Sequence, residues 1–170
     1  MFEAGDAVVH PVRGAGIIVS IEERSWRSER DLFYRIQLLN DPDSRLMVPV
    51  EAAEDLGLRP AISSKRLEQV WDVLTSEPTE LPSDHRERHR QLQERLRTGD
   101  VLAIAKAVRD MAWRKWGKKG LTTRGRRIYG EGLELLAGEI AAAEGVSLPA
   151  AETELRDTLR EMIQRASDES

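Results

Sequence analysis

The chain has 170 residues, a formal net charge of −4 and no cysteine, and 33% of its residues are charged while 5% are aromatic. This length allows one large or two small domains, and the lack of cysteine excludes disulfides, thiol nucleophiles and cysteine-based zinc sites. Neither end carries an apolar run long enough for a signal peptide or a membrane span, so we expect a cytoplasmic protein that does not enter membranes.

The first sixty residues show the alternating apolar pattern of short β-strands. Residues 5–21 predict a strand, a tight corner and a second strand, with Pro11 at a strand end and Gly16 at a bulge or bend that closes the sheet. Residues 24–31 are too polar for a core and are expected to form a connecting loop. The region 1–60 therefore predicts a small SH3-like or Tudor-like β-barrel, because strands this short need closure or a cover.

Two further strands are expected at 32–39 and 45–50. In the first of them, alternation separates Tyr34, Ile36 and Leu38 from the residues of the opposite face. In the second, the inward positions are Leu46 and Val48, and the outward positions are Arg45 and Met47.

Beyond a linker at 61–63 the apolar period changes from two to about 3.6, which predicts a helical domain over 64–170. The fold class is thus α+β with two domains, and the second domain contains about five helices. Capping residues mark the expected helix starts, namely Ser63 or Ser64, Ser83 or Asp84, Asp100, Thr122 and Ser147.

Positive charge is concentrated in one block of the helical region. Residues 86–127 contain 14 Lys and Arg against 4 Asp and Glu, whereas residues 128–170 contain 3 against 10. An acidic protein with such a basic block is expected to meet phosphate with one face only. The alternative is an ordinary charged helix face that binds no nucleic acid.

Several motifs, taken in order and spacing, resemble the CarD/CdnL/TRCF family of bacterial transcription regulators. They are Gly-Asp-x-Val-Val-x-Pro-x-x-Gly-x-Gly at 5–16, the Val-Pro to Gly-Leu-Arg stretch at 48–59, Thr-Gly-Asp-Val at 98–101, Ala-Val-Arg-Asp at 107–110 and Lys-Gly-Leu-Thr at 119–122. The resemblance implies an N-terminal module that docks on the RNA polymerase β subunit, and a helical domain that contacts promoter DNA just upstream of the melted −10 region. It also implies association with the nucleoid through the polymerase.

In this family the polymerase contact uses an exposed strand edge and basic side chains. The resemblance places that contact on Arg24, Arg45, Met47 and Val48. Met47 stands where some members carry an arginine, and Arg45, two residues earlier on the same face, is a possible substitute. In edge contacts of this kind, hydrogen bonds of main-chain groups provide the affinity, and a few charged side chains determine the register of pairing.

The DNA contact of the family falls on the start of the helix after Asp84. The implied residues are His85, Arg86, Arg88, Arg90, Arg126 and Arg127. His85 occupies the position of a tryptophan that wedges into the minor groove, and an imidazole is a smaller and more polar platform. Thr122 is a candidate cap for the following helix, although Gly125 replaces the glutamate of a capping box.

Other functions receive less support. The pair His85 and His89 has metal-ligand spacing, but three surrounding arginines disfavour a dication, so we expect no metal. The sequence has no phosphate-binding glycine loop before a helix and no serine in a nucleophile-elbow pattern, so we expect no cofactor and no enzymatic activity. Near the end of the third helix, Trp113 is expected to be exposed and Trp116 to pack in the core. We expect the protein to be a monomer. The remaining alternative to a DNA-binding regulator is an adaptor whose helical domain binds a protein such as a sigma factor.

Overall fold

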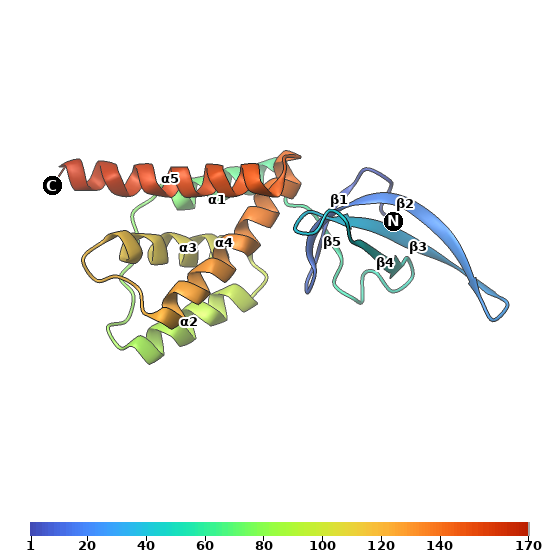
Figure 1. Ribbon diagram of the computed structural model, residues 1–170, viewed down its shortest axis with the longest axis horizontal. Coiled ribbons are helices and arrows are strands. Elements are labelled where there is room, and N and C mark those ends of the chain that lie inside the picture. The colour runs from blue at the N-terminus through green and yellow to red at the C-terminus, as the bar shows by residue number, and fades with distance from the viewer. Residues whose placement is uncertain (170) are drawn as a thin grey trace. The chain divides into compact units, whose positions relative to one another are not determined.

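The computed structural model describes residues 1–169 of the chain, which divides into two units. Unit 1 consists of Met1–Ser63 together with Gly138–Leu148, and unit 2 consists of Ser64–Ala137 together with the segment that begins at Pro149. The strands are β1 (Ala7–His10), β2 (Gly14–Trp26), β3 (Glu29–Leu38), β4 (Arg45–Pro49) and β5 (Arg59–Pro60). The helices are α1 (Ser64–Leu74), α2 (His85–Arg97), α3 (Val101–Trp116), α4 (Thr123–Glu144) and α5 (Leu148–Glu169) (Figure 1).

Unit 1 contains a five-stranded antiparallel sheet in the order β4, β3, β2, β1, β5. Strands β4 and β5 are its two edges, and no ladder joins them within the described residues, so the sheet is open. The α+β class, with strands first and helices after them, is confirmed. The predicted closed Tudor-like barrel is not confirmed.

Alternation along β3 determines which face of the sheet carries the core. Tyr34, Ile36 and Leu38 are buried, and they pack with Val48 of β4 in one apolar cluster. Their directly paired neighbours on β2 and β4 therefore share this inner face, since residues opposite each other in a ladder point to the same side. The inner and outer positions predicted for the third and fourth strands are confirmed.

Gly16 has a different role from the one predicted. It lies in regular register between Val8 and Leu38, and the register shift in β2 occurs later, between Ile18 and Ser20. A Cβ at Gly16 would lie 2.6 Å from Ile36 Cγ2 and 2.7 Å from the carbonyl oxygen of the next residue along β3. Glycine is therefore required by the close approach of β3, not by a bulge.

The expected loop at 24–31 is wrong. Strands β2 and β3 continue as a two-stranded ribbon up to the pair Trp26 and Glu29, and Figure 1 shows this ribbon extending beyond the other strands. Only Arg27 and Ser28 form the turn, with φ of 49° and 72°. The ribbon is polar because water reaches both of its faces, so the residue types resembled those of a loop.

The five predicted helices are present in unit 2, although the last turns of α4 belong to unit 1. Asp84 and Asp100 cap α2 and α3 through their carboxylates, which accept hydrogen bonds from the backbone N–H two residues later. The side chain of Asp110 is fully buried and binds Arg109, Arg95 of α2 and Thr79 of the preceding loop. Within the described residues, no helix has the length and apolarity needed to span a membrane.

Candidate functional site

The outer face of the sheet carries most of the residues implied in polymerase contact. Cross-strand register places Arg24 opposite Asp31, Met47 opposite Arg35 and Arg45 opposite Gln37. We call this set, with Trp26 and Phe33, the outer sheet face. It combines guanidinium groups with apolar surface, and 75% of Trp26 is exposed at the ribbon end.

Two arginines of this face share one carboxylate. The carboxylate of Glu22 accepts from Arg24 at 3.0 Å and from Arg35 at 3.1 Å. These two hydrogen bonds hold the pKa of Glu22 below its usual value. One carboxylate thus serves two guanidinium groups, and Arg45 donates to the backbone carbonyl of Pro42 at 2.7 Å without an ion pair in the described chain.

The free edge of β4 offers main-chain groups to a partner. The N–H of Val50 donates to the carbonyl of Leu32 at 2.9 Å, so in this antiparallel ladder the backbone groups of Val48 also face β3. The backbone groups of Arg45 and Met47 then point away from the sheet. Pro49 falls at an outward position too, where its missing N–H leaves no unpaired donor.

The predicted contact of Val48 with the polymerase conflicts with the burial of this residue. Its side chain is 2% exposed and belongs to the core cluster beneath the sheet. Its backbone faces β3, as shown by the register above. Alternation explains this result, because Val48 follows an outward residue and therefore points inward.

The second surface is formed where two helices begin. His89 Nε2 of α2 lies 3.1 Å from Thr122 Oγ1, and that hydroxyl accepts a hydrogen bond from Gly125 N–H at 3.0 Å. Thr122 is thus the N-cap of α4, and the starts of α2 and α4 lie side by side (Figure 1). Two helix N-termini at one place add their partial positive charges, which favours an anion.

Side-chain cations surround this junction. Burial lowers the pKa of His89, and the nearby charges of Arg88, Arg124, His85 and Arg114 lower it further. Sequence reasoning did not assign Arg114 or Arg124 to this contact: Arg114 was noted only among the basic residues near the two tryptophans, and Arg124 only as part of the basic block. The buried imidazole of His89 thus lies within the field of several positive charges, which disfavour its protonation.

The predicted DNA-contact residues differ in their accessibility. His85, Arg86, Arg126 and Arg127 are exposed, and in the described chain none of these three arginines is part of an ion pair. Arg90 is exposed but pairs with two glutamates, at 2.6 Å and 3.4 Å. We define the α2/α4 surface as His85, Arg86, Arg124, Arg126 and Arg127.

The predicted contact of Arg88 with DNA conflicts with the burial of this residue. It is 4% exposed, and its Nη1 donates to the carbonyls of Pro82 and Ser83, both at 3.1 Å. Its guanidinium ties the α1–α2 loop to the first turn of α2. The helix turns this position inward, so basic residue type alone misplaced it.

The tryptophans near the end of α3 are also placed differently from the prediction. Trp116 is 50% exposed rather than packed in the core. Trp113 is partly exposed, and its Nε1 is buried without a hydrogen-bond partner in the structure. The helix ends at Trp116, where no following turn covers the ring.

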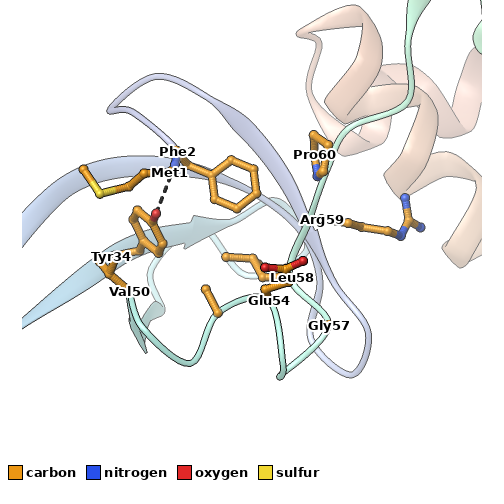
Figure 2. Close-up of a pocket in the computed structure, with 10 residues that line it drawn as sticks. Met1, Phe2, Tyr34, Val50, Glu54, Gly57, Leu58, Arg59 and Pro60 are labelled. Atoms are coloured by element: carbon orange, nitrogen blue, oxygen red, sulfur yellow. Dashed lines mark hydrogen bonds between the residues drawn. The ribbon is translucent and has the colours of Figure 1, made fainter.

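Figure 2 shows a pocket in unit 1 beneath the N-terminal residues. Its volume is about 620 Å³, and its walls include Phe2, Tyr34 and Leu58. Phe2 N–H donates to the Tyr34 hydroxyl at 3.0 Å, and the two rings meet edge to face. Glu54 and Arg59 are the charged side chains of its lining. The lining thus contains no nucleophile paired with a base.

The two rings of the histidine pair are separated, and one of them contacts another side chain. The rings of His85 and His89 lie 6.1 Å apart between centroids, and His89 Nε2 is engaged by Thr122. Among the described residues, no group of three His, Cys, Asp or Glu side chains is arranged to hold a metal ion.

Two family models match successive parts of this chain. The family model described as "CarD, C-terminal domain" matches residues 69–156, and the one described as "CarD-like/TRCF RID domain" matches residues 2–62. A Bacillus subtilis (strain 168) protein named "Putative transcription factor YdeB" is 24% identical over 147 residues, which cover 86% of this chain and 95% of that protein. The chain therefore belongs to the CarD family, as a transcription-related factor of the RNA polymerase-interacting type.

Proposed function

We propose that this protein regulates transcription by binding the β subunit of RNA polymerase through the outer sheet face and the β4 edge. The α2/α4 surface then contacts promoter DNA upstream of the −10 region and changes the stability of the open complex. The protein acts by binding and not by catalysis. The observation that carries the DNA contact is the convergence of two helix N-termini with exposed arginines that form no ion pair within the described residues.

The proposed polymerase contact is supported by the free edge of β4. Outward N–H and C=O groups at Arg45 and Met47 can extend a partner's sheet, while Arg24 and Arg45 recognise acidic groups nearby. Partner charges would set the register of pairing, as edge contacts alone do not distinguish one residue from the next.

The central experiment compares Arg126→Glu with Arg165→Glu in promoter complexes that contain polymerase. Both arginines are exposed, but Arg165 lies on α5, outside the α2/α4 surface. We expect Arg126→Glu to reduce the change that the protein causes in open-complex lifetime by roughly fivefold or more, because the substitution replaces attraction to a phosphate with repulsion. Equal behaviour of the two variants would argue against the DNA contact.

Salt dependence separates the DNA-contact proposal from the adaptor alternative. A phosphate contact makes the logarithm of complex stability fall with the logarithm of salt concentration, and each lost contact lowers the slope by about one. We expect a smaller slope for Arg126→Glu than for the unchanged protein. A slope that does not change would favour a protein partner, such as a sigma factor, for the helical unit.

Replacing His85 by tryptophan tests the position of the family's wedge residue. His85 is exposed at the start of α2, so an indole can be accommodated without disturbing the core. We expect His85→Trp to lengthen the open-complex lifetime, since a larger aromatic ring stacks better at an opened base step. An unchanged lifetime would show that this position no longer meets the DNA.

A further inference from the structure

A second aromatic and basic cluster lies away from the helix starts, at the end of α3. Trp116 is 50% exposed there, with Lys115 Nζ 4.9 Å and the Arg160 guanidinium carbon 5.4 Å from its ring centroid. Lys115 Nζ also lies 5.4 Å from the ring centroid of Tyr129 in α4. We call these four residues, with Arg156, the tryptophan patch, and all of them belong to unit 2.

Within the part of the chain that the structure describes, the cations of the tryptophan patch are not paired with carboxylates. Burial raises the pKa of the Tyr129 hydroxyl, while Arg156 and Arg160 both act on it in the opposite direction. Within residues 1–169, Lys115, Arg156 and Arg160 take part in no ion pair, although α5 carries several carboxylates. Lys118 and Lys119 follow Trp116 after a single glycine and are also exposed.

Packing alone does not account for Trp116. A tryptophan that serves the core buries its ring, as the nearby apolar residues of α3 do, whereas half of Trp116 remains in water. The cations over its ring hold guanidinium and ammonium groups close to an open aromatic surface. This combination fits a ligand that brings both a flat ring and negative charge.

We propose that the tryptophan patch binds single-stranded nucleic acid, with an unpaired base stacked on Trp116 and adjacent phosphates bound by the lysines and by Arg156 and Arg160. Bases in a duplex are already stacked on both sides, so an exposed indole discriminates in favour of unpaired strands. This site goes beyond the proposed function, because it requires neither the polymerase contact nor the α2/α4 surface.

The test measures binding of the full chain to a short fluorescein-labelled oligothymidylate by fluorescence anisotropy. Trp116→Leu keeps apolar bulk but removes the stacking platform, and we expect it to weaken binding by about tenfold. Trp116→Tyr should keep most of the affinity. Trp26→Leu, which removes the exposed tryptophan of unit 1, is the matched control and should bind like the unchanged chain. Thermal melts followed by circular dichroism establish that each variant is folded.

Several results would overturn this proposal. The first is that the unchanged chain does not bind the oligonucleotide detectably, and the second is that Trp116→Leu binds it as tightly as the unchanged chain. The third is that Trp26→Leu loses as much affinity as Trp116→Leu, and the fourth is that Trp116→Leu loses as much affinity for duplex DNA of the same length as for the single strand. Polyglutamate competing as well as the oligonucleotide, with the same dependence on Trp116, would assign the patch to an acidic protein partner instead. The Arg126→Glu experiment reports on promoter complexes, so either proposal can fail while the other stands.

Discussion

His89 links two helices through a contact between its ring and the hydroxyl of Thr122. Its buried imidazole meets the capping hydroxyl of α4, and Gly125 leaves the space for this approach, since a Cβ there would lie 3.2 Å from Thr122 Oγ1. Surrounding cations disfavour a proton on the ring. A residue that looked like half of a metal site is therefore part of a helix cap.

The free energy of unfolding should consequently fall in mild acid. Because the pKa of His89 in the folded chain lies below 6.5, the unfolded chain takes up the proton first as the pH decreases. The contribution of His89 is complete above 6.5 and is lost between that value and the folded pKa. Urea unfolding between about pH 7.5 and about pH 5.5 measures the loss.

A neutral variant isolates this effect. His89→Gln does not titrate, so its stability should decrease less over the same pH interval. Some decrease should remain, because burial and Arg13 also lower the pKa of His10, whose Nδ1 accepts from two backbone N–H groups of the β1–β2 turn. An unchanged pH dependence in His89→Gln would contradict the assignment.

Asp110 explains why the Ala-Val-Arg-Asp motif matters for the structure. Its carboxylate accepts from Arg109 Nε at 3.0 Å, from Arg95 Nη1 at 3.1 Å and from Thr79 N–H at 3.0 Å. Three segments of unit 2 are joined at one fully buried group. The motif therefore belongs to the core and not to a binding surface.

Asp110→Asn should destabilise the protein by roughly 3–5 kcal/mol, because it leaves two arginines without their buried counter-charge. Chemical denaturation gives the change in the free energy of unfolding. Asp100→Asn is the control: its side chain is about half exposed, asparagine caps a helix equally well, and only the surface ion pair with Arg66 is lost, worth about 0–1 kcal/mol. Equal losses in both variants would contradict the role of Asp110.

At the scale of elements, the β2–β3 ribbon shows how solvent exposure disguises a strand. Residues 24–31 carry the charges typical of a loop, yet they pair in register up to the turn. Both turn residues have positive φ, which is the geometry of a type I′ hairpin and is strained for residues with a Cβ.

Asn-Gly at positions 27 and 28 should relieve that strain. We expect the double variant Arg27→Asn and Ser28→Gly to stabilise the ribbon by roughly 1 kcal/mol. Hydrogen exchange of the ribbon amides measures the change as slower exchange. Replacing both turn residues by alanine keeps the strain and should give no protection, so equal protection in the two variants would exclude a type I′ explanation.

For the whole molecule, the proposed function assigns its two contacts to different units. Binding of one unit to the polymerase raises the effective concentration of the other at the DNA, and the overall affinity can then exceed that of either contact alone by a factor on the order of 10²–10⁴. A protein with net charge −4 can then use a weak DNA contact.

This arrangement predicts different titration curves for the two surfaces. Arg24→Glu should raise the protein concentration needed for a half-maximal effect on open-complex lifetime, by roughly tenfold, while leaving the maximum unchanged at saturation. Arg126→Glu should lower the maximum itself. Lifetimes measured over a protein titration distinguish the two cases, with Arg13→Glu as an exposed control in unit 1. Identical curve shapes for Arg24→Glu and Arg126→Glu would contradict the division of roles.

Local patterns were sufficient for most elements of this protein, but not for the exposed end of the β2–β3 ribbon. Apolar period and capping residues predicted five helices, and alternation predicted the buried side of β3 and β4, because these depend on neighbours in the chain. The family motifs likewise pointed to the correct family.

The folded arrangement alone decided which residues of each kind reach the surface. Arg88 turned inward onto two carbonyls, Val48 entered the core, and Trp116 remained exposed because its helix ends there. The open sheet and the junction of His89 with Thr122 also join residues far apart in sequence. Burial and partnership of a side chain depend on elements that pack from elsewhere in the chain, and neither residue type nor spacing carries that information.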